Sequence, residues 1–271
     1  MTERARRAAP VTLLVTALAV VVAFLAVPVV ALFCEVPLAR VPALIGGRQV
    51  REALWVTART VAIADGAMLL FCTPAAYLLA TRRFPGRGAL ITVLELPLVL
   101  PPAVAGVALL SAFGRGGLFG DALQDAGIVL PFTEWAVVLA ILFVSSPFYV
   151  RAAIAAFETL DPVYREAARS LGAGPWATFR LVTAPLAASG LTAGWVLAFA
   201  RGIGEFGATI IFAGSVRGQT QTLTLAIYDL IESDFDAALA MGILLVVTSA
   251  VVLVAYKLVA WRRTRPVAAR R

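Results

Sequence analysis

The sequence contains no histidine and only two cysteines, Cys34 and Cys72. Without histidine, the chain can form neither a histidine metal site nor a histidine acid–base pair. The two cysteines fall near opposite faces of the membrane in the topology given below, so we expect no disulfide and no metal site between them. Charged residues make up 14% of the chain, whereas a soluble domain has roughly 25%. This composition indicates that the chain is not a soluble protein.

Two further absences concern enzymatic activity. The chain has no Gly-x4-Gly-Lys-Ser/Thr loop to cradle a phosphate, and no nucleophile–base pair is visible. Gly202, Gly204 and Gly207 do spell Gly-x-Gly-x-x-Gly. No strand precedes them and they lie in a hydrophobic segment, so we interpret this match to the dinucleotide fingerprint as chance. We therefore predict no catalytic residue, no metal site and no cofactor bound by this chain.

Long apolar segments dominate what is present. Apolar residues make up 61% of the chain, and a helix needs about 20 of them to cross a bilayer. The net charge of +7 does not indicate nucleic-acid binding, because arginines cluster at the ends of the apolar segments. We predict an all-α integral membrane protein with one domain over 1–271 and six spans, at about 11–33, 54–80, 89–112, 135–156, 184–213 and 237–261.

The distribution of basic residues orients these spans. Arginine and lysine concentrate in 4–7, 82–87, 151–180 and 257–271, whereas the segments on the other side hold fewer: Arg40, Arg48, Arg51, Arg115 and Arg217. Because cytoplasmic segments carry the excess of basic residues, we predict that both termini are cytoplasmic. The first apolar segment is longer than the 7–15 residues typical of a signal peptide core, so we interpret it as an uncleaved span.

Two spans contain residues that are unusual in a membrane. Pro97, Pro101 and Pro102 should break or kink the third span, which is tolerated only where the freed backbone groups face protein or a water-lined cavity.

In the fifth span, Arg201 and Glu205 are four residues apart and can pair on one helical face that Thr209 continues. Charges inside spans are functional candidates, although an ion pair that only fixes helix packing remains open. Asp65, in the second span, needs a partner that the sequence does not identify.

A polar segment at 161–183 separates the fourth and fifth spans and centres on Glu166-Ala-Ala-Arg-Ser-Leu-Gly172. Asp161-Pro162 is typical of a helix start, and Gly172 of a helix end. We predict a helix over 162–171 and a second short helix over about 175–183. The small side chains of Ala167 and Ala168 would let another protein approach closely, although an amphipathic loop lying on lipid is the alternative.

This segment resembles the EAA loop of permease subunits of bacterial ABC importers. That pattern is Glu-Ala-Ala, three residues, Gly, nine residues, an aliphatic residue, one residue, then Leu-Pro. The positions in register are Glu166, Ala167, Ala168, Gly172, Val182 and Pro185, while Ala184 replaces the usual Leu. By this resemblance, Glu166, Ala167, Ala168, Arg169 and Gly172 form the helix that couples the permease to its ATPase.

The resemblance extends over roughly 54–260. In this range the chain is similar to the molybdate/tungstate branch of these permeases, which is close to the sulfate/thiosulfate permeases. It is carried by Glu95-Leu-Pro-Leu-Val-Leu-Pro-Pro102, Phe148-Tyr-Val-Arg151, Ala200-Arg-Gly-Ile-Gly-Glu-Phe-Gly-Ala208 and Gln219-Thr-Gln-Thr-Leu223. It implies the type I importer (MetI-like) fold and a homodimer that moves an oxyanion by alternating access. It also implies a cytoplasmic ATPase dimer that binds ATP and Mg²⁺, and a periplasmic or lipid-anchored binding protein. The implied translocation path includes Pro101, Pro102, Arg201, Glu205 and Thr209.

Three alternatives remain at this stage. A sulfate/thiosulfate permease would share the same fold and motifs. An ion-coupled secondary transporter would use Asp65, Arg201 and Glu205 as an ion relay and would need no ATPase. A membrane scaffold that moves no substrate would also have apolar spans. The EAA-like segment favours the ABC permease.

Overall fold

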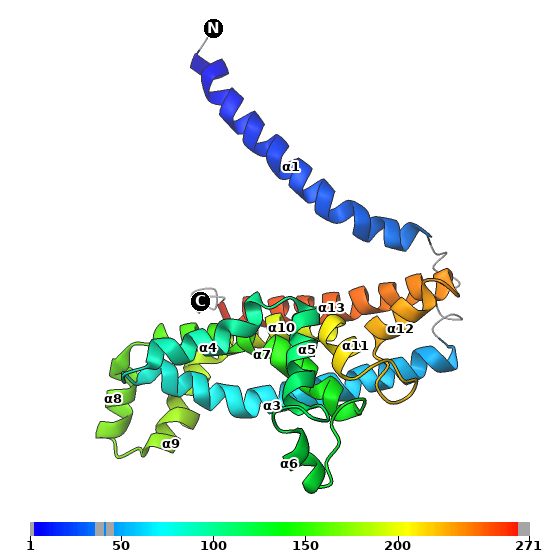
Figure 1. Cartoon of the computed structure of the whole chain (residues 1–271). Helices are drawn as coiled ribbons and strands as arrows, with labels where there is room; N and C mark the ends of the chain where they lie inside the picture. Colours follow the sequence, from blue (N-terminus) through cyan, green and yellow to red (C-terminus); the bar gives the residue numbers. More distant parts are fainter. Residues whose placement is uncertain (1–2, 36–40, 42–45, 265–271) are drawn as a thin grey trace.

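The computed structural model describes residues 3–35, 41 and 46–264, and every regular element in this part of the chain is helical (Figure 1). Four of the arginines used to predict the orientation of the spans, at 40, 265, 270 and 271, lie outside the described residues. The helices are α1 Glu3–Glu35, α3 Arg48–Thr81, α4 Arg87–Val99, α5 Pro102–Phe113, α6 Gly120–Asp125, α7 Glu134–Glu158, α8 Pro162–Ser170, α9 Pro175–Thr178, the π-helix η1 Phe179–Thr183, α10 Ala184–Ile203, α11 Gly207–Phe212, α12 Leu223–Leu230 and α13 Phe235–Thr264.

Five helical segments in the described residues are long and apolar enough to cross a membrane. They are Leu13–Glu35, Arg48–Thr81, Glu134–Glu158, Pro175–Ile203 and Phe235–Leu258. The pair α4 and α5 passes the same test only when its two helices are taken together. The six-span prediction therefore agrees with the structure if this broken pair counts as one span.

The helices α3, α7 and α10 run alongside one another and form the centre of the bundle (Figure 1). Met68, Tyr149 and Phe157 are fully buried between them. Gly190 and Gly194 of α10 face α7 so closely that an added Cβ would lie 2.5 Å and 2.7 Å from the Cβ atoms of Ala156 and Ala152. Small residues at such contacts let two membrane helices approach closely, which positions α10 firmly against α7.

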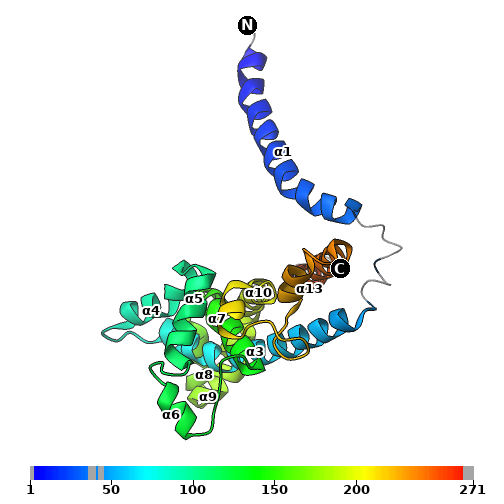
Figure 2. The same cartoon turned by 45° about the vertical axis from the view of Figure 1, so that its right-hand side comes forward.

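The helix α1 extends away from this bundle and meets it at one end (Figures 1 and 2). Leu32 lies near Gly242 of α13, where an added Cβ would be 3.5 Å from the Leu32 Cδ1 atom. The side chains from residue 13 to residue 31 are exposed in the isolated protomer. Lipid or another protein chain must therefore cover this apolar helix in a membrane.

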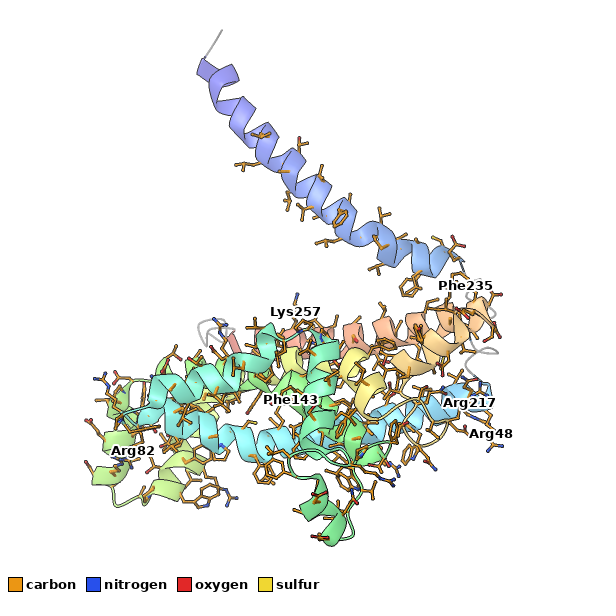
Figure 3. The ribbon with its side chains drawn as sticks, viewed as in Figure 1. Arg48, Arg82, Phe143, Arg217, Phe235 and Lys257 are labelled. Atoms are coloured by element: carbon orange, nitrogen blue, oxygen red, sulfur yellow. The ribbon has the colours of Figure 1, made fainter. Side chains whose placement is uncertain are left out.

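The two ends of the bundle differ in their side chains. Arg82 lies at the end that carries α8 and α9, whereas Arg48 and Arg217 lie at the opposite end (Figure 3). The helix α3 runs between these ends, from Arg48 to Thr81. The structure thus separates the two groups of arginines that the sequence places on opposite sides of the membrane.

The third span is not one helix over 89–112, as a simple span would be. It divides into α4 and α5, and the helical direction bends by 117° between them. Leu100 and Pro101 have extended ψ angles of 131° and 140°, and Pro102 then begins α5. The prolines explain the break because neither Pro101 nor Pro102 has an N–H group to donate to the preceding turn.

The fifth span also differs from the prediction. The second short helix expected over 175–183 is not separate, because α9, η1 and α10 form one continuous helical segment, Pro175–Ile203. The predicted span over 184–213 is interrupted at residues 204–206, after which α11 begins at Gly207. The break in the third span is therefore the one that its prolines predict, whereas the break in the fifth span was not expected.

Candidate functional site

The breaks in the third and fifth spans lie against each other. At Gly207, the first residue of α11, an added Cβ would lie 2.6 Å from the Cβ atom of Pro102 and 3.2 Å from the backbone nitrogen of Ala103. At Gly106 of α5, an added Cβ would lie 3.0 Å from the Ala208 Cα atom. Only glycine permits this approach, so the sequence places glycine on each side of the contact. Discontinuous helices packed in this way are typical of substrate paths in membrane proteins.

The predicted pair in the fifth span forms beside this contact. The Arg201 Nη1 atom lies 2.6 Å from the Glu205 Oε2 atom. The Glu205 side chain is 1% exposed and that of Arg201 is 28% exposed. Glu205 does not extend the helical face of Arg201, because α10 ends at Ile203. Its Oε1 atom instead accepts a hydrogen bond of 2.7 Å from the Ala208 N–H group, so Glu205 both neutralises Arg201 and holds the start of α11.

A third interaction fixes the same break. The Thr224 hydroxyl donates a hydrogen bond of 2.7 Å to the backbone carbonyl of Glu205. The Leu223 N–H group donates to the Thr57 hydroxyl of α3 at 2.8 Å. The first turn of α12 therefore joins the break to α3, a role that the sequence does not reveal because the contacting residues are far apart in the chain. Thr209, predicted on the path, is fully buried in α11, and its hydroxyl has no hydrogen-bond partner among the described residues.

The structure also identifies a partner for Asp65. The Trp195 indole N–H of α10 donates a hydrogen bond of 2.8 Å to the Asp65 Oδ2 atom. Asp65 lines a cavity of about 550 Å³ whose other walls are mainly apolar. Arg59, also in α3, forms an ion pair with Glu134 of α7. These contacts connect α3 with α10 and α7.

The helix α8 has the capped ends that the sequence predicts. The Asp161 carboxylate accepts a hydrogen bond of 2.9 Å from the Val163 N–H group, and Pro162 begins the helix. At the other end, Gly172 has φ +84°, and the N–H group of Ala173 donates to the Ala168 carbonyl at 3.0 Å. This is a Schellman motif, which stops the helix where the backbone turns left-handed. The result is a short rigid helix at one end of the bundle (Figure 1).

One face of α8 is free in the protomer. Glu166, Ala167 and Arg169 are exposed, as a surface that contacts another protein requires. Ala168 is 8% exposed, so our expectation that both alanines form the outer surface is wrong. Ala168 faces inward because α8 packs against η1. Bulky side chains that the sequence analysis did not select extend the exposed surface: Val163, Tyr164 and Leu171, of which Leu171 is 89% exposed.

A continuous helical path connects α8 with the break. The helix α8 packs against η1, and η1 continues directly into α10. Thr178 and Thr183 hold the π-helical turn, because the Thr183 hydroxyl donates to the Thr178 carbonyl at 3.3 Å. At the far end of α10 stands Arg201. The helical segment Pro175–Ile203 therefore has α8 packed near one end and Arg201 near the other.

The sequence also matches a described protein family. Residues 72–265 match the binding-protein-dependent transport system inner membrane component family. The chain belongs to this family. The match includes the two breaks, α8 and the path between them. The permease is thus a membrane subunit of a transport system, and it spans the membrane several times.

Individual relatives agree with this assignment. The permease is 45% identical over 231 residues to the molybdenum transport system permease protein ModB of Mycobacterium bovis, covering 85% of this chain and 88% of that protein. It is 36% identical over 209 residues to the sulfate transport system permease protein CysW of Synechococcus elongatus, covering 75% and 73%. A bacterial alginate ABC transporter crystal structure contains a chain with a TM-score of 0.75 at 19% identity, covering 96% of both chains. The last comparison shows the fold, which is that of an ABC importer permease.

Proposed function

We propose that this permease is the membrane subunit of an ATP-driven importer that moves an oxyanion, molybdate or tungstate, into the cytoplasm. It works as a homodimer with a cytoplasmic ATPase dimer and a periplasmic or lipid-anchored binding protein. Both termini are proposed to be cytoplasmic. ATP and Mg²⁺ are proposed to bind to the ATPase, since the sequence of this chain has no Gly-x4-Gly-Lys-Ser/Thr loop. The observation that carries the proposal is α8, a rigid exposed helix that is joined through η1 and α10 to the Arg201–Glu205 break.

The anion is proposed from the relatives. The alignment with the M. bovis protein named for molybdenum transport covers 88% of that protein at 45% identity. The CysW relative, which is named for sulfate transport, matches at 36%. The sulfate/thiosulfate permease is therefore the second candidate. Both anions are divalent and tetrahedral, so the two candidates use the same residues in the mechanism.

The mechanism follows from the connected elements. Glu166, Ala167, Ala168, Arg169 and Gly172 belong to the segment seated on the ATPase, with Ala168 packed inward and the others exposed. Closure of the ATPase around ATP displaces α8, and α10 carries this displacement to Arg201 and Glu205. Pro101 and Pro102 lie on the facing break, so a small movement of α10 changes the contact between the two breaks. Alternating access is the reopening of this contact toward one side of the membrane and then the other.

Leu171 offers a direct test of the coupling surface. We expect Leu171→Ala to weaken co-purification with the ATPase, because this side chain is 89% exposed and central apolar contacts carry much of an interface's free energy. Leu118→Ala is the matched control, because Leu118 is 81% exposed but belongs to the segment before α6, away from α8 (Figure 1). Equal ATPase binding by both variants would contradict the assignment of α8 as the coupling helix.

The decisive experiment reconstitutes the permease with the ATPase and the binding protein encoded beside it. ATPase activity and uptake in liposomes are measured with molybdate, tungstate or sulfate on the binding protein. Stimulation by one loaded binding protein supports the importer and names its anion. No associated ATPase and no stimulation would refute the proposal. Uptake that continues without ATP under an ion gradient would instead favour an ion-coupled transporter that uses Asp65, Arg201 and Glu205.

A further inference from the structure

A cavity lies beyond the two breaks, where α5 ends and the segment before α7 returns to the bundle. Its volume is about 530 Å³. The lining residues are Leu110, Gly114, Arg115, Val129, Pro131 and Phe132. They come from the C-terminal end of α5 and from residues 129–132, so the cavity opens next to α5, one of the two helices that follow the breaks.

Arg115 is the one charged residue in this lining. Within the described residues, no carboxylate oxygen lies within 4.0 Å of its guanidinium nitrogens, although Asp121 and Asp125 belong to the same segment. Arg48, Arg59 and Arg201 each have a carboxylate partner. The cavity therefore contains a positive charge that the protomer does not neutralise.

The wall of the cavity is fixed to α11. The Phe132 N–H group donates a hydrogen bond of 3.2 Å to the Phe212 carbonyl at the end of α11. Phe132 has φ 61°, a left-handed conformation that is uncommon for an aromatic residue. Its ring also lies close to Gly214, where an added Cβ would be 3.0 Å from the Phe132 Cδ1 atom. Backbone strain of this kind persists where the surroundings hold it, often at functional sites. The hydrogen bond to Phe212 joins the cavity wall to α11, the helix that follows the second break.

We propose that Arg115 and this cavity receive the oxyanion before it reaches the breaks. The inference rests on the proposed function, including its orientation with Arg115 on the outer side. Arg201 cannot attract an anion strongly from outside because Glu205 compensates its charge at 2.6 Å. Arg115 is uncompensated, and low-dielectric walls such as Leu110, Val129 and Phe132 concentrate its field.

The chemistry of the guanidinium fits this role. Its planar fork matches two oxygens of a tetrahedral oxyanion, which a lysine ammonium does not reproduce in the same geometry. Arg115 is itself exposed, so water competes for the anion. A single exposed cation gives weak binding, and a translocation path needs sites that release the ion as readily as they bind it.

The first test measures uptake by the complete reconstituted complex with saturating loaded binding protein. Arg115→Gln should lower the turnover by about tenfold, the effect of losing one charge-assisted hydrogen bond, and Arg115→Lys should restore part of it. Arg217→Gln is the matched control, because Arg217 is also an exposed arginine but does not line the cavity. Equal losses in both arginine-to-glutamine variants would overturn the inference, because the effect would then be one of general surface charge.

A second test restores the charge chemically. Cys34 and Cys72, the free cysteines of the described residues, are replaced by serine, and Arg115→Cys is introduced. A cationic methanethiosulfonate should restore uptake, whereas a neutral one of similar size should not. Molybdate should also slow the modification of the introduced thiol when ATP is absent, a readout that does not depend on transport.

The outcomes distinguish failure of the proposed function from failure of the inference about Arg115. If the wild-type complex moves no oxyanion, the proposed function fails. If the wild type transports and Arg115→Gln transports equally well, only the inference about Arg115 fails. Restoration by the neutral adduct, or no protection by molybdate, would likewise overturn this inference while leaving the importer in place.

Discussion

At the scale of single residues, Glu205 combines three interactions at the break after α10. Its side chain contacts Arg201 and the Ala208 N–H group, and its carbonyl accepts from Thr224. The carboxylate is almost fully buried, so its charge requires compensation. Because the interactions involve different atoms, substitutions can separate the role of the charge from that of the hydrogen bonds.

Glu205→Gln should remove the charge and keep an oxygen for the Ala208 N–H group. We expect the variant to be less stable by about 2 kcal/mol, below the 3–5 kcal/mol of a fully buried broken pair because Arg201 is partly exposed. Thermal unfolding in detergent measures this loss. The double variant Arg201→Gln/Glu205→Gln should recover part of it, since it leaves no unpaired charge. If the double variant were less stable than the wild type by the sum of the two single losses, the two charges would not interact.

Gly207 tests the contact between the two breaks. Gly207→Ala places a Cβ 2.6 Å from the Pro102 Cβ atom, and we expect a loss of stability of about 1–3 kcal/mol together with reduced uptake. Gly204→Ala is the control in the same break, because its nearest neighbour would be 3.7 Å away. Thermal unfolding and uptake are measured for both variants and compared with the wild type. If Gly207→Ala behaves like Gly204→Ala, the breaks are not tightly packed in the membrane.

At the scale of elements, the proposed coupling role of α8 requires that the helix keep its capped ends. Asp161 fixes its first turn and Gly172 ends it with φ +84°. Pro162, which begins the helix, fits the first turn because its missing N–H is not needed there. A helix of nine residues has little intrinsic stability in water, so these caps and its packing on η1 maintain it.

Gly172→Ala should therefore uncouple the permease without disturbing its core. Alanine fits the space at Gly172, but the left-handed conformation costs roughly 1–2 kcal/mol. We expect weaker ATPase association and slower uptake, with an unchanged unfolding temperature of the membrane bundle. Gly174→Ala provides the control, because that position is equally open and has φ −66°. Normal ATPase stimulation in the Gly172→Ala complex would contradict a coupling role for the end of α8.

The sequence predicts features that depend on neighbouring residues and misses those that depend on packing. The caps of α8 and the break at Pro101 and Pro102 were predicted, because a missing N–H or a glycine turn acts locally. The 117° angle was not, since it follows from the packing of α5 on α11. The inward direction of Ala168 and the Trp195–Asp65 bond were also missed. The latter joins residues 130 positions apart, and no periodicity identifies such a pair.

At the scale of the whole molecule, the isolated protomer leaves the broken helices uncovered. The helix α4 has no buried residue, and Val104 and Val107 of α5 are 46% and 52% exposed. These residues adjoin the breaks, so lipid cannot be their permanent neighbour if the path carries a hydrated anion. A second copy related by a two-fold axis would cover them and enclose the path between two identical surfaces.

Crosslinking at α5 tests this homodimer. In a two-fold dimer, a residue near the axis faces its own copy. Val104→Cys is therefore introduced into a chain whose Cys34 and Cys72 are replaced by serine. The two introduced cysteines should form a disulfide between protomers if their Cα atoms come within about 7 Å. Val251→Cys is the control, because Val251 is 61% exposed on α13 and would face lipid. Non-reducing electrophoresis of oxidised membranes measures the product. If α10 moves the facing break as proposed, trapping ATP on the ATPase should change the yield for Val104→Cys. A crosslink that forms equally at Val251, or that is insensitive to ATP, would argue that α5 does not line a gate between two copies.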